Sequence, residues 1–252
     1  MIDTGQYEGM IAETVTVRHA DGSWLPAYSA RPLGSGPFPA VVLFHHRPGW
    51  DEYYREATRK LAQHGFFAVC PDLYSRFGQG DPDDVSAMVR AAGDVSDQAV
   101  IDDGKACVAW LKNHPVTNGN VAVMGSCSGG RHALLTACND QNVAAVVDLW
   151  GGRVVMAPEE LNDRYPVAPI DLTEQLSCPV LGLFGDKDTA PTPAEVDQHE
   201  AVLVAAGKTF EFHRYPEAGH GFFYYDRPAM YHAESAVDGW RKILTFLNNT
   251  LR

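Results

Sequence analysis

Short runs of almost wholly apolar residues recur along this chain, and turn residues bound each of them. Such runs are typical of strands in a parallel sheet, because both faces of that sheet are buried and neither carries polar side chains. We expect five buried strands, at residues 40–44, 66–70, 121–124, 143–149 and 179–184. Residues 10–32 instead alternate apolar and polar positions around an Asp-Gly turn, which predicts an antiparallel hairpin at one edge of the sheet.

Between the predicted strands lie segments with apolar residues three and four positions apart, which is the spacing of a helix with one buried face. Residues 100–111 carry such a stripe ahead of Asn-His-Pro at 113–115, where the helix is expected to end. Residues 51–63, closed by Gly65, and residues 236–247 predict two further helices. Strands that alternate with helices indicate a mostly parallel, doubly wound sheet with helices on both faces.

The whole chain, residues 1–252, is expected to form a single α/β domain, since it holds no repeat and its length suits one domain. Residues 77–95 and 152–176 match neither a helix nor a strand. Ligands bind to doubly wound sheets at the carboxyl ends of the strands. We therefore predict that these two stretches pass over that edge of the sheet and shape a pocket there.

Charge and composition exclude several classes of protein. The formal net charge of −12 argues against a nucleic-acid partner, because binding to phosphates needs a basic surface. Five cysteines without regular spacing predict free thiols in a reducing compartment. The first fifteen residues lack the pattern of a signal peptide, and no run approaches the roughly 18 apolar residues of a membrane span. We expect a cytoplasmic monomer or homodimer with no membrane association.

The most informative segment is residues 121–137, which read as a buried strand, a Gly-x-Cys-x-Gly turn and a helix. The turn is expected to hold Cys127 in a strained conformation above the sheet, between glycines, because a Cβ beside it would collide with neighbouring backbone. The N-terminus of the following helix points at the thiol and favours a thiolate and an oxyanion alike. The spacing of a phosphate-binding loop is absent. We predict that Cys127 is a nucleophile, with Ser126 and Ser128 as less favoured alternatives.

Two later loops contain candidate partners for this nucleophile. A hydrolase with such a strand-turn-helix motif carries its acid and then its base further along the chain. Asp188 follows the apolar run at 179–184, and His220 lies between two glycines after another strand. His220 would accept the thiol proton while Asp188 orients the imidazole. Asp186 is an alternative that more often caps a turn, and Asp148, at the end of a preceding strand, is the second choice of acid.

With these motifs the chain resembles the dienelactone hydrolase (carboxymethylenebutenolidase) family of α/β-hydrolases, over most of its length from Pro39 to Leu247. The resemblance implies an α/β-hydrolase fold with a triad of Cys127, Asp188 and His220. It also implies an oxyanion hole formed by the backbone N–H groups of Arg47 and Ser128. The motifs that carry the resemblance are Cys-Pro-Asp-Leu-Tyr-Ser-Arg at 70–76, Gly-Ser-Cys-Ser-Gly-Gly at 125–130, Gly-Asp-Lys-Asp at 185–188, Ala-Gly-His-Gly-Phe at 218–222 and Arg-Pro at 227–228.

Three further positions show how the chain relates to the best-known enzyme of that family. There a glutamate helps to activate the nucleophile, and the matching residue here is His46. Two arginines of that enzyme hold the substrate carboxylate; Arg76 matches one, and Tyr224 stands where the other falls. Two interpretations of His46 stay open, since it either acts on the thiol or substrate or only hydrogen-bonds its loop. Arg76 either binds an acidic group of the substrate or is a solvated residue at a strand end. The departures predict a substrate other than the dienelactone.

These residues predict a hydrolase that opens an ester or lactone of a small molecule through a thioester on Cys127. A cysteine suits good leaving groups, such as those of enol lactones and aryl esters, because a thiolate is itself easily expelled. Two other functions stay open, a non-catalytic small-molecule-binding protein and a redox-sensitive thiol protein. The latter lacks a nearby resolving cysteine, since Cys138 lies about three turns down the helix. We expect no cofactor and no metal, because no His-Glu-x-x-His or Cys-x-x-Cys pair is present.

Overall fold

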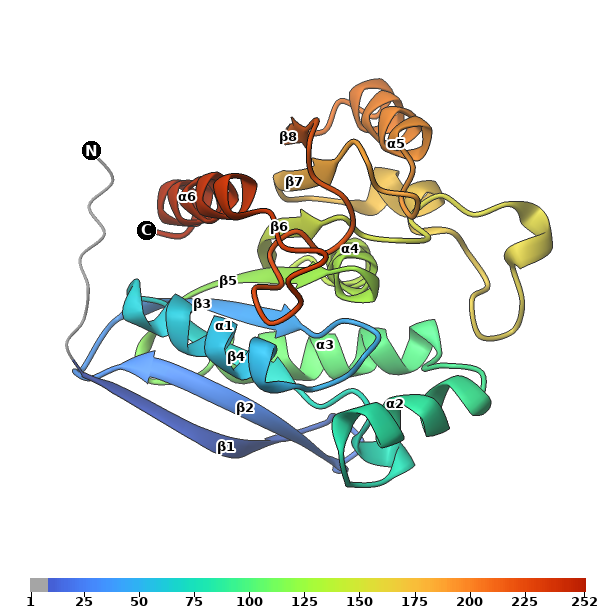
Figure 1. The fold of residues 1–252 in the computed structure, drawn as a ribbon. Coiled ribbons are helices and arrows are strands. Elements are labelled where there is room, and N and C mark those ends of the chain that lie inside the picture. The colour runs from blue at the N-terminus through green and yellow to red at the C-terminus, as the bar shows by residue number, and fades with distance from the viewer. Residues whose placement is uncertain (1–8) are drawn as a thin grey trace.

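An eight-stranded β-sheet forms the centre of the molecule, as Figure 1 shows. The structure is a computed structural model and describes residues 9–252. The strand order is β1-β2-β4-β3-β5-β6-β7-β8; β2 is antiparallel to both of its neighbours, and the remaining pairs are parallel. The strands are β1 Met10–Arg18, β2 Trp24–Pro32, β3 Phe38–Phe44, β4 Phe67–Pro71, β5 Thr117–Ser126, β6 Val143–Leu149, β7 Val180–Gly185 and β8 Phe210–Tyr215.

Helices cover both faces of this sheet. Side chains of α1 and α6 join the strands in one apolar cluster, and side chains of α3 and α4 join the cluster on the opposite face. The prediction of a mostly parallel, doubly wound α/β domain with helices on both faces is therefore confirmed. The helices are α1 Glu52–Gln63, α2 Pro82–Ala91, α3 Asp97–Lys112, α4 Ser128–Asn139, α5 Pro193–Ala205 and α6 Ala233–Leu251, with short 3₁₀ helices η1 Ser75–Phe77, η2 Pro158–Glu160 and η3 Pro169–Gln175.

Strand β3 shows why the predicted strands are apolar throughout. Ala40, Val42 and Phe44 lie in the cluster under α3 and α4, whereas Val41 and Leu43 lie in the cluster under α1 and α6. Successive side chains of a strand point to opposite faces, so a strand covered on both faces has no position left for a polar residue. Full burial of each larger aliphatic or aromatic side chain contributes about 1.5–3 kcal/mol. The five predicted apolar runs correspond to β3, β4, β5, β6 and β7.

The two edges of the sheet follow a different pattern. The predicted hairpin is formed by β1 and β2 and lies at one edge, as expected. Strand β8 lies at the other edge, and its sequence Phe-Glu-Phe-His-Arg-Tyr is mostly half-buried or exposed. An edge strand has one neighbour and partial cover, so it tolerates polar residues and has no purely apolar run.

The stretch at residues 77–95 corrects one expectation, because it contains a regular helix, α2. Its start is marked by Asp81, whose side chain accepts the N–H of Asp83, and by Pro82 in the first turn. Only Val85, Ser86 and Val89 are buried, so this face is too narrow to produce a clear apolar stripe. The second stretch, residues 152–176, contains the short 3₁₀ helices η2 and η3.

Two expectations concern membranes and targeting. Within residues 9–252, no helix combines the length and the apolar character that crossing a bilayer requires. The predicted absence of a signal peptide rests on the first fifteen residues, and residues 1–8 lie outside the part of the chain that the structure describes.

Candidate active site

Cys127 lies in the sharp turn between β5 and α4, at the carboxyl end of the sheet. Its φ of 57° is in the left-handed region, which a residue with a Cβ seldom adopts and which costs of order 1–3 kcal/mol. The flanking glycines allow this turn, since a Cβ on Gly125 would lie 2.3 Å from the carbonyl carbon of Gly129. A Cβ on Gly129 would in turn lie 2.3 Å from the carbonyl oxygen of Phe44. The glycines therefore let the helix start against the sheet while the thiol projects above it.

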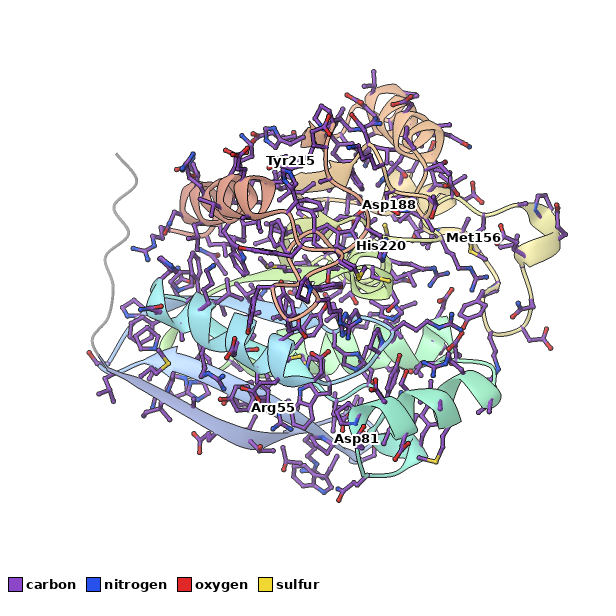
Figure 2. All side chains as sticks on the ribbon, viewed as in Figure 1. Arg55, Asp81, Met156, Asp188, Tyr215 and His220 are labelled. Carbon is purple, nitrogen blue, oxygen red and sulfur yellow. The ribbon has the colours of Figure 1, made fainter. Side chains whose placement is uncertain are left out.

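Asp188 and His220 come together beyond the ends of β7 and β8, and the two labelled side chains lie close to each other in Figure 2. The Nδ1 atom of His220 is 2.9 Å from Oδ2 and 3.2 Å from Oδ1 of Asp188. Asp188 is buried and also accepts the N–H of Ala190 at 2.9 Å. Burial alone would lower the pKa of His220, but hydrogen bonds with Asp188 and Cys127 outweigh it and raise that pKa to about 10.

The other two candidate acids lie elsewhere. Asp186 makes an ion pair with Arg214, with 2.6 Å between a carboxylate oxygen and the guanidinium. Asp148 is fully buried under the turn, where its Oδ1 accepts the N–H of Gly151 at 2.8 Å. No partner in residues 9–252 binds its other oxygen, and burial raises its pKa to about 7. Among the three carboxylates, Asp188 is the one that contacts His220.

The loop after β3 holds one of its backbone N–H groups in a fixed direction. The carbonyl oxygen of His46 accepts hydrogen bonds from His45 Nδ1 at 2.8 Å and from the Gly49 N–H at 3.0 Å. A trans peptide directs its N–H opposite to its carbonyl, so these bonds also fix the direction of the Arg47 N–H. Within residues 9–252, neither this N–H nor that of Ser128 donates to a protein acceptor. Both residues line the same pocket as Cys127, so two free donors are available there.

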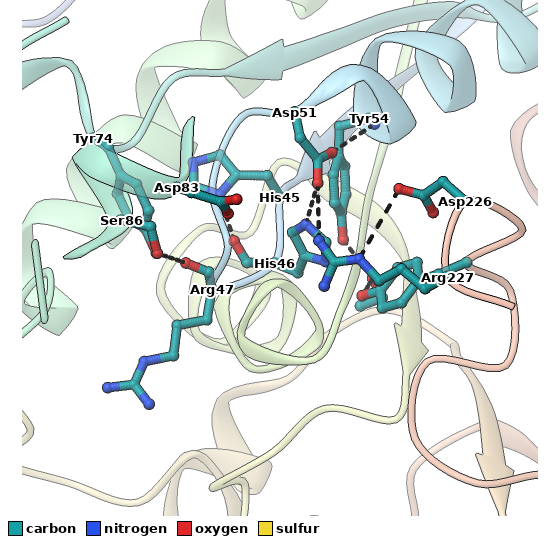
Figure 3. Close-up of polar contacts among 12 residues, drawn as sticks. His45, His46, Arg47, Asp51, Tyr54, Tyr74, Asp83, Ser86, Asp226 and Arg227 are labelled. Carbon is teal, nitrogen blue, oxygen red and sulfur yellow. Dashed lines mark hydrogen bonds and ion pairs between the residues drawn. The ribbon is translucent and has the colours of Figure 1, made fainter. Parts of the chain in front are cut away.

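The next carbonyl group of this loop, that of Arg47, is also held by hydrogen bonds. Both the Tyr74 hydroxyl and the Ser86 hydroxyl donate to the carbonyl oxygen of Arg47, at 2.8 Å and 2.9 Å (Figure 3). His45 is buried and its Nε2 accepts the N–H of Leu73 at 3.3 Å, which requires a neutral ring. Burial lowers the pKa of His45 to about 4, in agreement with that state. No sequence motif predicts these contacts, because the backbone groups of Leu73 and Arg47 lie far along the chain from the side chains that bind them.

A pocket of about 530 Å³ opens in front of Cys127 and His220. Both irregular stretches contribute to its wall, through Asp94 and Val95 and through Gly152, Arg153 and Tyr165. The remaining lining residues are Arg47, Tyr74, Ser128, Arg131, His132, Asp188, Thr189 and Ala190.

Arg76 does not line this pocket, so the geometry gives no support to the interpretation in which it binds an acidic group of the substrate, and it is not a freely solvated residue either. Its Nη2 lies 2.7 Å from both carboxylate oxygens of Asp103, and Nη1 donates to the Leu73 carbonyl at 3.2 Å. Asp103 is fully buried, and the guanidinium supplies its bidentate charged partner, while His19 Nε2 lies 3.3 Å from Oδ1 of the same carboxylate. Arg76 is therefore a structural partner of α3.

His46 and Tyr224 are both buried, and neither lines the pocket. The Nε2 atom of His46 lies 2.7 Å from Oδ2 of Asp51, the residue that caps α1, as Figure 3 shows. The rings of His46 and Tyr224 are 4.8 Å apart between centroids. The Tyr224 hydroxyl pairs with Ser126 Oγ at 2.8 Å, and Ser126 also pairs with Tyr54. His46 therefore bonds its own loop, while a substrate-binding role for Tyr224 stays a prediction.

A buried ion pair that the sequence analysis missed supports the pocket wall. Arg131, one turn after Cys127 in α4, bonds both carboxylate oxygens of Asp97 at the start of α3. Its Nε also donates to the Arg153 carbonyl at 3.1 Å. The sequence signal is limited to an arginine in the first helical turn, because Asp97 is far away along the chain. No group of three or more potential metal-ligating side chains occurs in the described part of the chain.

The chain is similar to known proteins over most of its length. The model of the dienelactone hydrolase family matches residues 25–251. A protein of Methylorubrum extorquens described as "Putative carboxymethylenebutenolidase" is 37% identical over 240 residues, which cover 93% of this chain and 80% of that protein. One of Escherichia coli with the same description is 34% identical over 230 residues, covering 89% and 82%.

A solved structure shows the same fold. The crystal structure of a "Putative Dienelactone Hydrolase" from Klebsiella pneumoniae superposes with a TM-score of 0.86 at 33% sequence identity. The superposition covers 96% of this chain and 99% of that one. The α/β-hydrolase fold predicted from the sequence is therefore confirmed over almost the whole chain.

Proposed function

Since the chain belongs to the dienelactone hydrolase family and is a carboxylic ester or lactone hydrolase, we propose that it works through a thioester on Cys127. The observation that carries this proposal is that Cys127 lines one pocket together with the hydrogen-bonded pair of His220 and Asp188, and that the thiol helps to raise the pKa of His220. The substrate is the ester or lactone of a small molecule that fits about 530 Å³.

In the first half of the reaction, the sulfur of Cys127 attacks the acyl carbon while its proton resides on His220. The carbonyl oxygen takes up negative charge and is stabilised by the N–H groups of Arg47 and Ser128. The carbon–oxygen bond then breaks, and His220 returns the proton to the departing oxygen. A thioester remains on the cysteine. Asp188 keeps the imidazole oriented and stabilises its positive charge throughout.

In the second half, water attacks the thioester carbon and loses a proton to His220. The same two N–H groups stabilise the second oxyanion. The carbon–sulfur bond breaks and the carboxylic acid leaves. Cys127 is then a thiolate again, beside a protonated His220, as at the start. Because the loop carbonyls around Arg47 are held by Tyr74, Ser86 and His45, the donors need no rearrangement at either step.

A screen of aryl esters and lactones beside a Cys127→Ala variant tests this function. We expect turnover only in the wild type, together with a mass increase equal to the acyl group on the Cys127 peptide after rapid acid quench. Release of that adduct by hydroxylamine would identify a thioester. Equal rates for both proteins on every substrate would refute the hydrolase mechanism. Stoichiometric ligand binding without turnover would instead support the non-catalytic alternative, and peroxide-dependent modification alone would support the redox alternative.

A further inference from the structure

The imidazole of His45 is held between two pieces of backbone that lie far apart in the sequence. The side chain is buried, and the Tyr74 ring packs edge-on against it at 4.6 Å between centroids. Its Nδ1 atom is 2.8 Å from the carbonyl oxygen of His46, and its Nε2 atom is 3.3 Å from the backbone nitrogen of Leu73. The ring therefore bridges the loop after β3 and the loop after β4, and both of its nitrogens are occupied.

These two contacts are compatible with a single protonation state of the His45 ring. The Leu73 N–H can only donate, so Nε2 carries no hydrogen and accepts. The His46 carbonyl can only accept, so Nδ1 carries the hydrogen and donates. A charged ring, or the other neutral tautomer, would set an Nε2 hydrogen against the Leu73 N–H. The pairing with Leu73 thus makes Nδ1 a donor to the His46 carbonyl.

The carbonyl that His45 holds belongs to the peptide group that joins His46 to Arg47. This peptide is trans, so a hydrogen bond to its carbonyl also sets the direction of the Arg47 N–H. The N–H of Gly49 donates to the same carbonyl at 3.0 Å, but that bond lies within the loop and turns with it. The His45 ring instead ties the peptide to another element, through Leu73.

The other two anchors of this loop act on the next peptide group. Tyr74 and Ser86 both donate to the carbonyl of Arg47. The nitrogen of that peptide belongs to Pro48, which has no N–H to direct. Tyr74 and Ser86 therefore hold the path of the loop, whereas His45 sets the direction of a donor.

The end of β3 also packs against the turn that carries the nucleophile. A Cβ on Gly129, in the first turn of α4, would lie 2.3 Å from the carbonyl oxygen of Phe44 and 2.9 Å from that of His45. The backbone at His45 is thus in direct contact with the segment that supplies the N–H of Ser128. With these two segments fixed against each other, the relative placement of the two free donors depends on how the peptide of Arg47 is turned.

We propose that His45 is a positioning residue of the oxyanion hole. Its Nδ1–H, kept in that tautomer by the Leu73 N–H, directs the Arg47 N–H to the oxygen that becomes charged in both halves of the reaction. This inference rests on the proposed hydrolase function and adds to it the group that prepares the oxyanion hole before substrate binds. His45 does not line the pocket, so it acts through the Arg47 peptide and not on the substrate.

Two substitutions separate the roles of the two ring nitrogens. Asparagine places a side-chain N–H near the position of Nδ1, whereas glutamine, one methylene longer, places its amide near that of Nε2. On the aryl ester that the wild type hydrolyses fastest, His45→Gln should lower kcat and kcat/KM together by about 10–100-fold, because a misdirected donor is missed in the transition state. His45→Asn keeps a donor for the His46 carbonyl and should retain most of the activity.

The matched control is His199→Gln. His199 is another buried histidine, on α5, whose pKa burial also lowers to about 4, and it does not line the pocket. The same substitution there removes a buried imidazole without touching the loop after β3. It should leave kcat and kcat/KM at the wild-type values.

Two covalent probes of Cys127 distinguish a role in the oxyanion hole from a general loss of structure. When a trifluoromethyl ketone adds to the sulfur, a carbon–sulfur bond forms and the carbonyl electron pair moves to the oxygen, so the adduct carries an oxyanion. Iodoacetamide alkylates the same sulfur with loss of iodide and forms no oxyanion. In His45→Gln, we expect the inhibition constant of the ketone to rise by the factor by which kcat/KM falls, while the alkylation rate equals that of the wild type.

The outcomes that would overturn the proposal are distinct. Unchanged turnover and ketone affinity in His45→Gln would overturn it, and so would an equal loss in His45→Asn. A parallel loss of ketone affinity and alkylation rate would show that His45 acts on the thiol or on the fold. If His45→Gln does not fold, His45→Asn decides, since it must keep the ketone affinity. If the wild type is no faster than Cys127→Ala on every ester, the hydrolase function fails, while the ketone affinities still support or refute the role of His45.

Discussion

Ser126 and Ser128 flank the nucleophile in the sequence but lie in opposite environments. Ser126 is buried, and its hydroxyl pairs with those of Tyr54 and Tyr224. Ser128 lines the pocket, where its N–H has no acceptor within residues 9–252. Behind Cys127 the neighbouring hydroxyls are therefore satisfied within the protein. In front of it, donors are left for a ligand, which is the arrangement that binding and catalysis need.

The same contrast holds for the charged groups on the two sides. On the buried side, His46 pairs with Asp51, and the rings around it stack edge to face. On the pocket side, the pair of His220 and Asp188 borders the open pocket, and Arg153 has no hydrogen-bonded carboxylate in the described part of the chain. We therefore expect the buried side to contribute mainly to stability and the pocket side mainly to the chemistry. Three substitutions test this division.

The largest effect is expected for Asp188→Asn, on the pocket side. Asparagine can still accept the Ala190 N–H, but it no longer stabilises a charged imidazole. We expect kcat/KM on an aryl ester to fall by about 10³–10⁴-fold, since the imidazole loses both its orientation and its counter-charge. The pKa of His220, about 10 in the wild type, should fall, which titration of its ring by NMR would show. Retained activity would contradict this assignment and favour Asp148 as the acid.

The pH dependence of the free energy of unfolding provides a second measurement on the pair of His220 and Asp188. The pKa of His220 is raised from 6.5 to about 10 in the folded protein, so its pairing stabilises the fold fully below pH 6.5. This contribution is lost as the pH rises toward 10. The unfolding free energy of Asp188→Asn should therefore depend less on pH across that window than that of the wild type. Identical pH dependence in both proteins would show that the pair contributes nothing to folding.

Asp148→Asn, under the turn, is expected to raise the free energy of unfolding instead of lowering it. The pKa of Asp148 rises from 3.8 to about 7 on folding, so the wild type loses stability as the pH increases from 4 to 7. Asparagine keeps the acceptor for Gly151 and removes the charge. The variant should gain at most about 4 kcal/mol at pH 8 relative to the wild type, and much less at pH 5, in urea unfolding. An equal change at both pH values would rule out a charge effect.

The smallest effect is expected for Tyr224→Phe, on the buried side. It removes one hydroxyl partner of Ser126, while Tyr54 keeps the other, so we expect a loss of about 0.5–1.5 kcal/mol in the free energy of unfolding. The KM for an aryl ester should not change, because Tyr224 does not line the pocket. Tyr54→Phe is the matched control from the other side of Ser126. A rise in KM in Tyr224→Phe but not in Tyr54→Phe would support a substrate-binding role for Tyr224.

Much of the fold was predictable because its signals are local. Burial on both faces leaves apolar runs at β3 to β7, and the glycines around Cys127 stand within one short stretch of the sequence. By contrast, α2 escaped prediction, since one of its three buried residues is a serine that bonds the Arg47 carbonyl. The chain order of Cys127, Asp188 and His220 also follows from local motifs, each placed after its own strand.

The amino-acid sequence by itself determined the family, the sheet and the three residues proposed for the chemistry, because each is encoded within a short stretch of chain. Only the tertiary structure decided which other side chains line the pocket. Arg76 is directed to Asp103 and His46 to Asp51, whereas Arg153 is held at the pocket by Arg131 and Tyr165. The physical reason is that a long polar side chain takes its direction from its partners. Those partners come from other elements, which only folding brings together.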